Sequence, residues 1–170
     1  MAAISIKWYN YNKYFIWLIK IEVGNLNTIS IREIIENDFK DIYMLNQELG
    51  YEYDEQKVKK RIEYIMKNTK GVIFVAQQNN EVIGYIHGSP YELLYGDSLV
   101  NILGLVVKNQ YRSLGVGSIL IEKLESWSKE NEFYGVRLVS GYDRVIAHKF
   151  YENHGYVNRK NQKNFIKVLD

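Results

Sequence analysis

The segment from Leu99 to Gly117 constrains the fold more than any other part of the chain. Leu99 to Val107 is apolar at nearly every position, which is typical of a central strand covered on both faces. A turn with Gly115 and Gly117 follows, and we expect a long helix from about Ser113 to Glu130. Leu120, Leu124 and Trp127 lie on the expected core face of that helix. A buried strand that leads through a glycine turn into an amphipathic helix predicts a sheet with helices packed against it.

The rest of the chain predicts further short strands and amphipathic helices. Strands are expected at residues 28–32, 72–76, 81–87 and 136–140, with one or two more in 156–169. Helices are expected after the capping residues Asn37 or Asp38, Asp54, and Asp143, and the first and last end at Gly50 and Gly155. This order predicts an α/β (α+β mixed) domain over residues 28–170, with a mixed sheet and helices on both faces. Residues 1–27 are an N-terminal extension that adds a strand or lies on the body.

Composition excludes several classes of protein. The 170 residues include no cysteine and three histidines, which excludes disulfide frameworks, thiolate zinc sites and cysteine nucleophiles. A net charge of +2, from 22 basic and 20 acidic residues, is not that of a polybasic nucleic-acid binder. The apolar run Tyr14 to Ile19 is too short to span a membrane. We expect a cytoplasmic protein without a metal, a nucleic-acid partner or a membrane partner.

The glycine turn at Arg112–Ser118 is typical of an anion site. The first turn of a helix presents unpaired N–H groups and the positive end of the helix dipole, and Arg112 adds a fixed charge. No lysine follows Gly117, so the turn is not a P-loop, and Leu120 stands where a dinucleotide fingerprint needs a third glycine. Taken alone, the two glycines have an equally good structural explanation, since they allow a tight strand-to-helix turn without binding any ligand.

Three segments together resemble the GNAT acetyltransferase family. Arg112-x-x-Gly115-x-Gly117 matches its pyrophosphate loop, and Leu105-Val106-Val107 matches its fourth strand. The segment Ala147-His148-Lys149-Phe150-Tyr151-Glu152-Asn153-His154-Gly155-Tyr156 matches the signature of its fourth helix. The resemblance in element order runs from about Thr28 to Leu169. It implies a GNAT-like, mostly antiparallel sheet with a splayed parallel pair formed by strands 99–107 and 136–140.

The resemblance also implies a cosubstrate and a mechanism. Acetyl-CoA would bind in the cleft between the splayed strands, with its pyrophosphate on the loop residues Arg112, Ser113, Leu114, Gly115, Val116, Gly117 and Ser118. The main chain of Leu105 and Val107 would pair with the pantetheine arm, and an N–H near Leu105 or Val106 would stabilise the oxyanion. Transfer to the amine would be direct. Tyr151 holds the general-acid position, and a phenol with an ordinary pKa near 10 is protonated at neutral pH.

Two parts of the expected site are less well defined. Arg144 stands where many family members carry Asn, and it can reach a CoA phosphate or cap acidic neighbours instead. Glu92 is our candidate base, with Asp97 and His87 as alternatives, and all three can also be ordinary surface or edge residues. His148 and His154 are six residues apart, which is not the spacing of a ligand pair, so we interpret both as partly exposed helix residues.

The acceptor is expected to be a small amine. The family's substrate walls correspond to Tyr51–Glu55 and Tyr91–Asp97, where tyrosines mixed with carboxylates suit a cationic amine such as a polyamine or an amino sugar. The alternatives are a protein N-terminal or lysine acetyltransferase, an acyl-CoA sensor without turnover, and a phosphate-ligand domain outside the family. The resemblance to the family also suggests a homodimer.

Overall fold

The computed structural model describes residues 4–11, 14–21 and 28–169, with side chains from Thr28 onward. The chain forms two compact units that divide between Leu138 and Val139. The first unit contains β1 (Ile4–Tyr11), β2 (Tyr14–Ile21), β3 (Ile29–Glu33), η1 (Glu36–Asp38), α1 (Phe39–Leu49), α2 (Glu55–Asn68), β4 (Val72–Gln78), β5 (Glu81–Leu93), β6 (Gly96–Val107), η2 (Asn109–Tyr111), α3 (Val116–Glu130) and β7 (Gly135–Leu138). The second unit contains α4 (Val145–Asn153).

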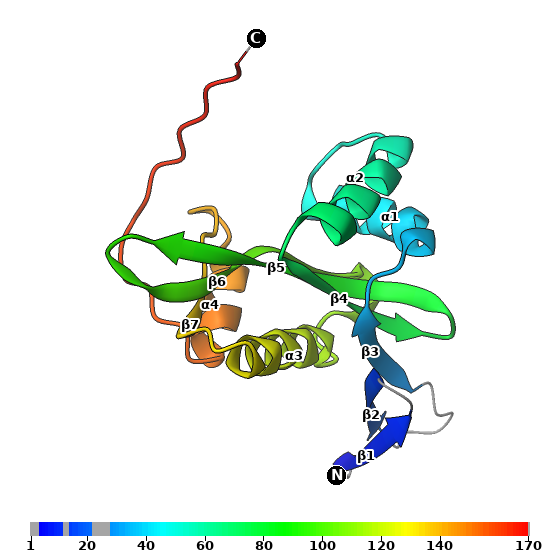
Figure 1. Ribbon diagram of the computed structural model, residues 1–170. Helices are drawn as coiled ribbons and strands as arrows, with labels where there is room; N and C mark the ends of the chain where they lie inside the picture. The colour runs from blue at the N-terminus through cyan, green and yellow to red at the C-terminus, as the bar shows by residue number, and fades with distance from the viewer. Residues whose placement is uncertain (1–3, 12–13, 22–27, 170) are drawn as a thin grey trace. The chain divides into compact units, whose positions relative to one another are not determined.

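One seven-stranded sheet forms the first unit, in the spatial order β1 to β7 (Figure 1). All neighbours from β1 to β6 pair antiparallel, and β6 and β7 pair parallel. The predicted mixed, mostly antiparallel sheet with one parallel pair is therefore confirmed.

Helices cover both faces of this sheet, as predicted. Helices α1 and α2 lie on one face and α3 lies on the other (Figure 1). Leu45 of α1 and Ile62 of α2 are buried in one core cluster with Val75 of β4. On the other face, Leu120 and Leu124 of α3 are completely buried.

Several helix and turn signals act as the sequence predicts. Gly50 follows α1 with a φ of 95°, a left-handed conformation in which glycine avoids the steric cost of a Cβ. Asp54 caps α2, and its Oδ1 accepts a hydrogen bond of 2.9 Å from the N–H of Lys57. Asn79 and Asn80, with φ values of 50° and 65°, form the tight turn between β4 and β5.

Two helix starts differ from the prediction. Helix α3 begins at Val116 rather than near Ser113, because Ser113 and Gly115 have left-handed φ values of 61° and 82° that cannot continue a helix. Helix α4 has Arg144 at its N-cap, and Asp143 does not cap it with its side chain. The backbone carbonyl of Asp143 instead accepts a hydrogen bond from the N–H of Val145.

The predicted final strands are wrong. Residues 156–169 contain no strand, and the apolar side chains near the end, such as Phe165 and Leu169, are exposed. A strand requires a partner for its backbone groups, and the described part of the second unit offers one helix and irregular chain.

The strands next to residues 89–97 are longer than predicted. Strand β5 continues to Leu93 and β6 begins at Gly96, so only Leu94 and Tyr95 form the turn of a hairpin. In the N-terminal extension, β1 and β2 form a hairpin whose second strand pairs with β3, with Trp17 opposite Ile31. Within the described ranges, no helix is both long and apolar enough to cross a membrane.

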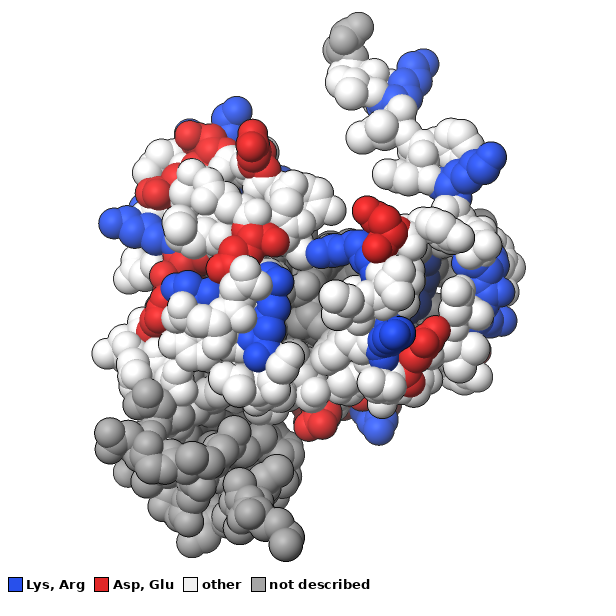
Figure 2. Space-filling model, turned by 180° about the vertical axis from the view of Figure 1, so that it is seen from behind, with Lys and Arg blue, Asp and Glu red and all other residues white. Residues whose placement is uncertain are grey.

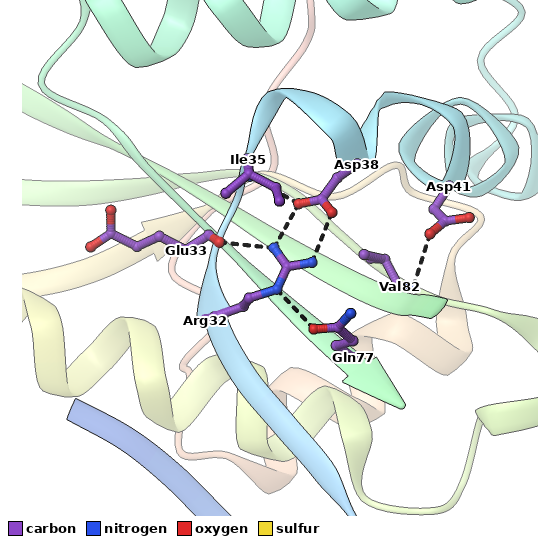
Figure 3. Close-up of polar contacts among 7 residues, drawn as sticks. All are labelled: Arg32, Glu33, Ile35, Asp38, Asp41, Gln77 and Val82. Atoms are coloured by element: carbon purple, nitrogen blue, oxygen red, sulfur yellow. Dashed lines mark hydrogen bonds and ion pairs between the residues drawn. The ribbon is translucent and has the colours of Figure 1, made fainter. Parts of the chain in front are cut away.

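A partly buried ion pair fixes the start of α1 (Figure 3). Two nitrogens of the Arg32 guanidinium donate hydrogen bonds of 2.7 and 2.8 Å to the carboxylate of Asp38. The N–H of Ile35 donates to the same carboxylate, and Arg32 Nε donates to Gln77 Oε1. Asp38 thus lies at the predicted cap position of α1, but its side chain points back to β3. This arrangement ties α1 to the sheet.

Candidate functional site

Strand β6 loses its neighbour halfway along its length. The parallel pairing with β7 ends at Ile102 and Leu138, whereas β6 continues to Val107. On its other side β6 stays paired with β5, with Gly104 opposite His87 and Val107 opposite Gly84. In an antiparallel pair, every second residue turns its backbone groups away from the partner strand. The last residues of β6 therefore present an edge that no described strand pairs, as the predicted splay requires.

A bulge lies at the start of this open edge. His87 is opposite Gly104 and Gly88 is opposite Ile102, so Leu103 has no partner residue in β5. A bulge of this kind bends a strand and redirects its backbone groups.

The glycine turn lies between η2 and the start of α3. The turn supplies the acceptor of the first hydrogen bond of the helix, in which the N–H of Ile119 donates to the carbonyl of Gly115. The N–H groups of Val116 and Gly117 have no acceptor among the described residues. A helix end of this kind attracts an anion through its free N–H groups and its dipole.

Arg112 holds the turn in place by contacts to β6 and to α1. Its Nε donates a hydrogen bond of 2.9 Å to the carbonyl of Val107, at the end of β6. Its Nη2 lies 3.3 Å from the carboxylate of Glu48, which also accepts from the N–H of Asn109. Arg112 therefore links β6, α1 and the turn, in addition to the positive charge that the sequence predicts there.

A cavity of about 180 Å³ lies between the helices α1 and α2 and the sheet. Its aliphatic lining consists of Ile34, Ile42, Val58, Ile62, Ile65 and Ile73. Its polar lining consists of Asn46, Tyr53, Arg61, Tyr85 and His87. No acidic residue lines it. The cavity adjoins the bulge, because His87 pairs with Gly104 and a Cβ at position 104 would lie 3.5 Å from the Tyr85 ring.

Burial controls the protonation of two lining residues. It raises the pKa of Tyr85 to about 12, with a smaller effect from Tyr51, so the phenol keeps its proton. The Tyr85 hydroxyl donates a hydrogen bond of 2.7 Å to Asn46 Oδ1. Burial and the nearby Arg61 charge together lower the pKa of His87 to about 4, so this imidazole is neutral at physiological pH.

The predicted acceptor residues fall into two groups. Tyr53 lines the cavity, whereas Glu52, Glu92 and Asp97 do not. Glu92 is exposed on the β5–β6 hairpin, where its carboxylate accepts a hydrogen bond from the Ser98 hydroxyl. The role of Glu92 as the base stays a prediction.

Sequence reasoning missed three of the five polar lining residues, namely Asn46, Arg61 and Tyr85. Arg61 belongs to the run of basic residues on α2, and nothing in the sequence distinguishes it from its neighbours. Tyr85 carries a usable signal, because it is two residues from His87 on one strand and therefore on the same face.

The second unit carries Tyr151 and Arg144. Tyr151 lies on α4, with its ring packed against those of Phe150 and Tyr156 at centroid distances of 5.5 and 5.8 Å. Burial raises the pKa of Tyr151, and the nearby Arg144 charge opposes this shift in part. The phenol is therefore protonated at neutral pH, as a general acid must be.

The two histidines of α4 interact with backbone carbonyls. His148 Nε2 lies 2.9 Å from the carbonyl oxygen of Gly141, and His154 Nδ1 lies 2.7 Å from that of Phe150. The described part of the chain contains no group of three or more side chains arranged to hold a metal ion.

The half-buried His87 predicts sensitivity to acid. Its pKa is about 4 in the folded protein and near 6.5 in the unfolded chain, so below pH 6.5 the unfolded state binds a proton that the folded state does not. We expect this group to lower the free energy of unfolding by roughly 2 to 3 kcal/mol between pH 7 and pH 4.5. Urea denaturation of the wild type and of His87→Gln at both values measures the effect. An equal loss in the two proteins would contradict it.

Together these features define an α/β protein whose parallel strand pair opens beside a glycine turn and the unpaired N–H groups at the start of α3. A sequence profile of the Acetyltransferase (GNAT) family matches residues 30–156. The chain belongs to this family, and its activity is that of an acyl-CoA-dependent N-acetyltransferase.

Individual relatives agree with this assignment. The uncharacterized N-acetyltransferase YhdJ of Bacillus subtilis (strain 168) is 24% identical over 68% of this chain and 82% of its own length. The uncharacterized N-acetyltransferase MJ1530 of Methanocaldococcus jannaschii is 36% identical over 51% of this chain and 53% of its own. Among solved structures, the aminoglycoside N-acetyltransferase AAC(6')-Iy in complex with CoA has a TM-score of 0.76 at 17% identity, covering 87% of this chain and 100% of its own. The last similarity is one of fold.

Proposed function

We propose that the protein transfers an acetyl group from acetyl-CoA to the primary amine of a small molecule. The observation that carries this proposal is the open edge of β6, which leads directly into the glycine turn and the free N–H groups of α3. This arrangement fits a ligand with an extended amide-containing arm and a pyrophosphate at its end. A solved neighbour of this fold is a complex with CoA.

The proposed cosubstrate site uses main-chain groups. The loop from Arg112 to Ser118 holds the pyrophosphate at the N-terminus of α3. Leu105 and Val107 pair with the pantetheine arm on the open edge, and Val106 lies between them in β6. Arg112 positions this loop through Val107 and Glu48. Arg144 of the second unit stays a candidate for a CoA phosphate.

Bound acetyl-CoA supplies a thioester, which a neutral amine can attack directly. The amine nitrogen forms the new bond to the carbonyl carbon, the carbon–sulfur bond breaks, and the amine loses one proton. An N–H of β6 near the bulge stabilises the charge on the carbonyl oxygen. Tyr151 gives its phenolic proton to the departing thiolate, its raised pKa keeps that proton available, and solvent then returns a proton to the phenolate. The amine's proton leaves through solvent or through a base such as Glu92.

Calorimetric titration with acetyl-CoA, desulfo-CoA and ATP tests the cosubstrate site. We expect micromolar binding of both CoA species and none of ATP, because the turn lacks the lysine of a P-loop. A screen for thiol release with primary amines and peptides then tests transfer. Binding without release for any amine would support a sensor instead, and release with peptides alone would support a protein acetyltransferase.

Gly115→Ala is expected to weaken acetyl-CoA binding about tenfold. Gly115 has a φ of 82°, a conformation that costs an L-residue roughly 1 to 2 kcal/mol, and a Cβ there would meet nothing within 4 Å. The variant loop can relax when empty and must return to the left-handed form to bind. Gly50→Ala is the matched control, with a φ of 95° and equally open space. Calorimetry should give a wild-type Kd for Gly50→Ala, and equal Kd values for both variants would contradict the loop's role.

A further inference from the structure

The cavity under α1 and α2 has an unbalanced charge. Arg61 is the only residue in its lining that is charged at neutral pH, because the His87 imidazole is neutral there. Arg61 is exposed on α2, its guanidinium lies 4.9 Å from the centre of the Tyr64 ring, and it forms no ion pair with a carboxylate of the described residues. Figure 2 shows acidic and basic side chains mixed over the helical part of this unit. The lining of the cavity as a whole therefore carries one positive charge, at its solvent-exposed side, and this charge favours an anionic group on the ligand.

The size and surface of the cavity limit the rest of the ligand. Its volume of about 180 Å³ is close to that of a protein cavity that binds benzene, about 150 Å³. Pockets for larger ligands usually measure about 300 to 1,000 Å³. Six of its eleven lining residues are aliphatic. The cavity opens to solvent, so its volume limits only the part of the ligand that enters it, which is one small apolar group.

The environment disfavours a second positive charge. From α2 the cavity is faced by Arg61, from the α1–α2 connection by Tyr53, and from β5 by Tyr85 and His87, while α1 contributes the neutral Asn46. The same burial and the same Arg61 charge that keep His87 neutral act on any bound ammonium group. A carboxylate on the ligand would offset Arg61, and burial would still favour the neutral amine that attack requires.

Building on the function proposed above, we infer that this cavity receives the acceptor, and that the acceptor is an amine with an adjacent carboxylate on a small apolar body, as in an aliphatic α-amino acid. Arg61 pairs with the carboxylate, the aliphatic residues receive the side chain, and Gly104 at the bulge lies beside the amine. This replaces the expectation of a cationic amine, because the carboxylates on which that expectation depends do not line the cavity.

Three acceptors test the inference directly. Leucine has the carboxylate and the apolar body, leucinamide has the same body without the charge, and spermidine is a polycation. With acetyl-CoA as donor, we expect kcat/KM for leucine to exceed the values for leucinamide and spermidine by about threefold to fivefold, as an ion pair with an exposed guanidinium provides. Calorimetry with desulfo-CoA present should show the same order of affinity without turnover.

Variants of Arg61 separate recognition from catalysis. Arg61→Gln should raise KM for leucine about threefold to fivefold with kcat within about twofold, and leave leucinamide kinetics and the acetyl-CoA Kd unchanged. Arg61→Lys keeps the charge and should recover part of the loss. Lys60→Gln is the control, since Lys60 is an exposed neighbour on α2 that does not line the cavity.

The outcomes distinguish this inference from the proposed function. Acetylation of spermidine or a peptide in preference to leucine would overturn the inference and leave amine acetylation standing. Leucine kinetics that are the same in Arg61→Gln and the wild type would overturn the role of Arg61. Binding of acetyl-CoA without acetylation of any amine would overturn the proposed function, and the inference with it.

Discussion

A Tyr151→Phe variant is expected to lose about a hundredfold in kcat, at the lower end of the range for a general acid. The leaving thiolate then takes its proton from water. Phenylalanine keeps the ring that packs against Phe150 and Tyr156, so stability should change little. The Kd for acetyl-CoA should also stay the same. Stopped-flow or steady-state thiol release measures kcat, and thermal unfolding checks the fold.

Tyr142→Phe is the matched control, because Tyr142 belongs to the same unit and is 89% exposed. The pH profile adds a second readout. Burial raises the pKa of Tyr151 above its ordinary value of 10, so wild-type kcat should show no decline from this group between pH 7 and pH 9. If kcat of Tyr151→Phe is within threefold of the wild-type value, Tyr151 is a packing residue and not the general acid.

Asp38→Ala is expected to lower the free energy of unfolding by about 3 kcal/mol. The substitution leaves the Arg32 guanidinium without its carboxylate in a site where Asp38 is 6% exposed, and removes the acceptor for the N–H of Ile35. For a chain of this length the change corresponds to a fall in Tm of roughly 10 °C. Differential scanning calorimetry measures it.

Glu36→Gln provides the comparison for this ion pair. Glu36 lies 3.8 Å from Lys67 between exposed side chains, and its loss should cost less than about 0.5 kcal/mol. The double variant Arg32→Gln, Asp38→Ala should lose less free energy of unfolding than the two single variants lose together, because neither charge remains without its partner. Equal losses for Asp38→Ala and Glu36→Gln would show that the partly buried pair contributes little.

Local signals account for the parts of the fold that the sequence predicted well. Asp54 caps α2 through a residue three positions away, and Gly50 ends α1 through its own backbone conformation. The turn at Asn79–Asn80 and the apolar strand β6 likewise depend on neighbouring residues. The glycine turn was predicted with its position correct, but α3 begins later because Ser113 and Gly115 are left-handed.

Contacts over long sequence distances account for what the sequence did not predict. Arg61 of α2 and Tyr85 of β5 are 24 positions apart in the chain, and they line one cavity because α1 packs against both α2 and β5. Asp38 was expected to cap a helix, yet its carboxylate binds Arg32 on the preceding strand. The segment Phe165–Leu169 has the composition of a strand, but composition does not supply a pairing partner.

The open edge of β6 also bears on how this protein can diverge. A ligand that lies along Leu105 and Val107 is recognised through main-chain N–H and C=O groups, which are the same in every residue but proline. Side chains at these positions are therefore free to change to suit the sheet, provided that the strand and its bulge persist. Substitutions should accordingly be tolerated at Leu105 and Val107 of β6 and should impair binding at the turn, where the backbone itself depends on glycine.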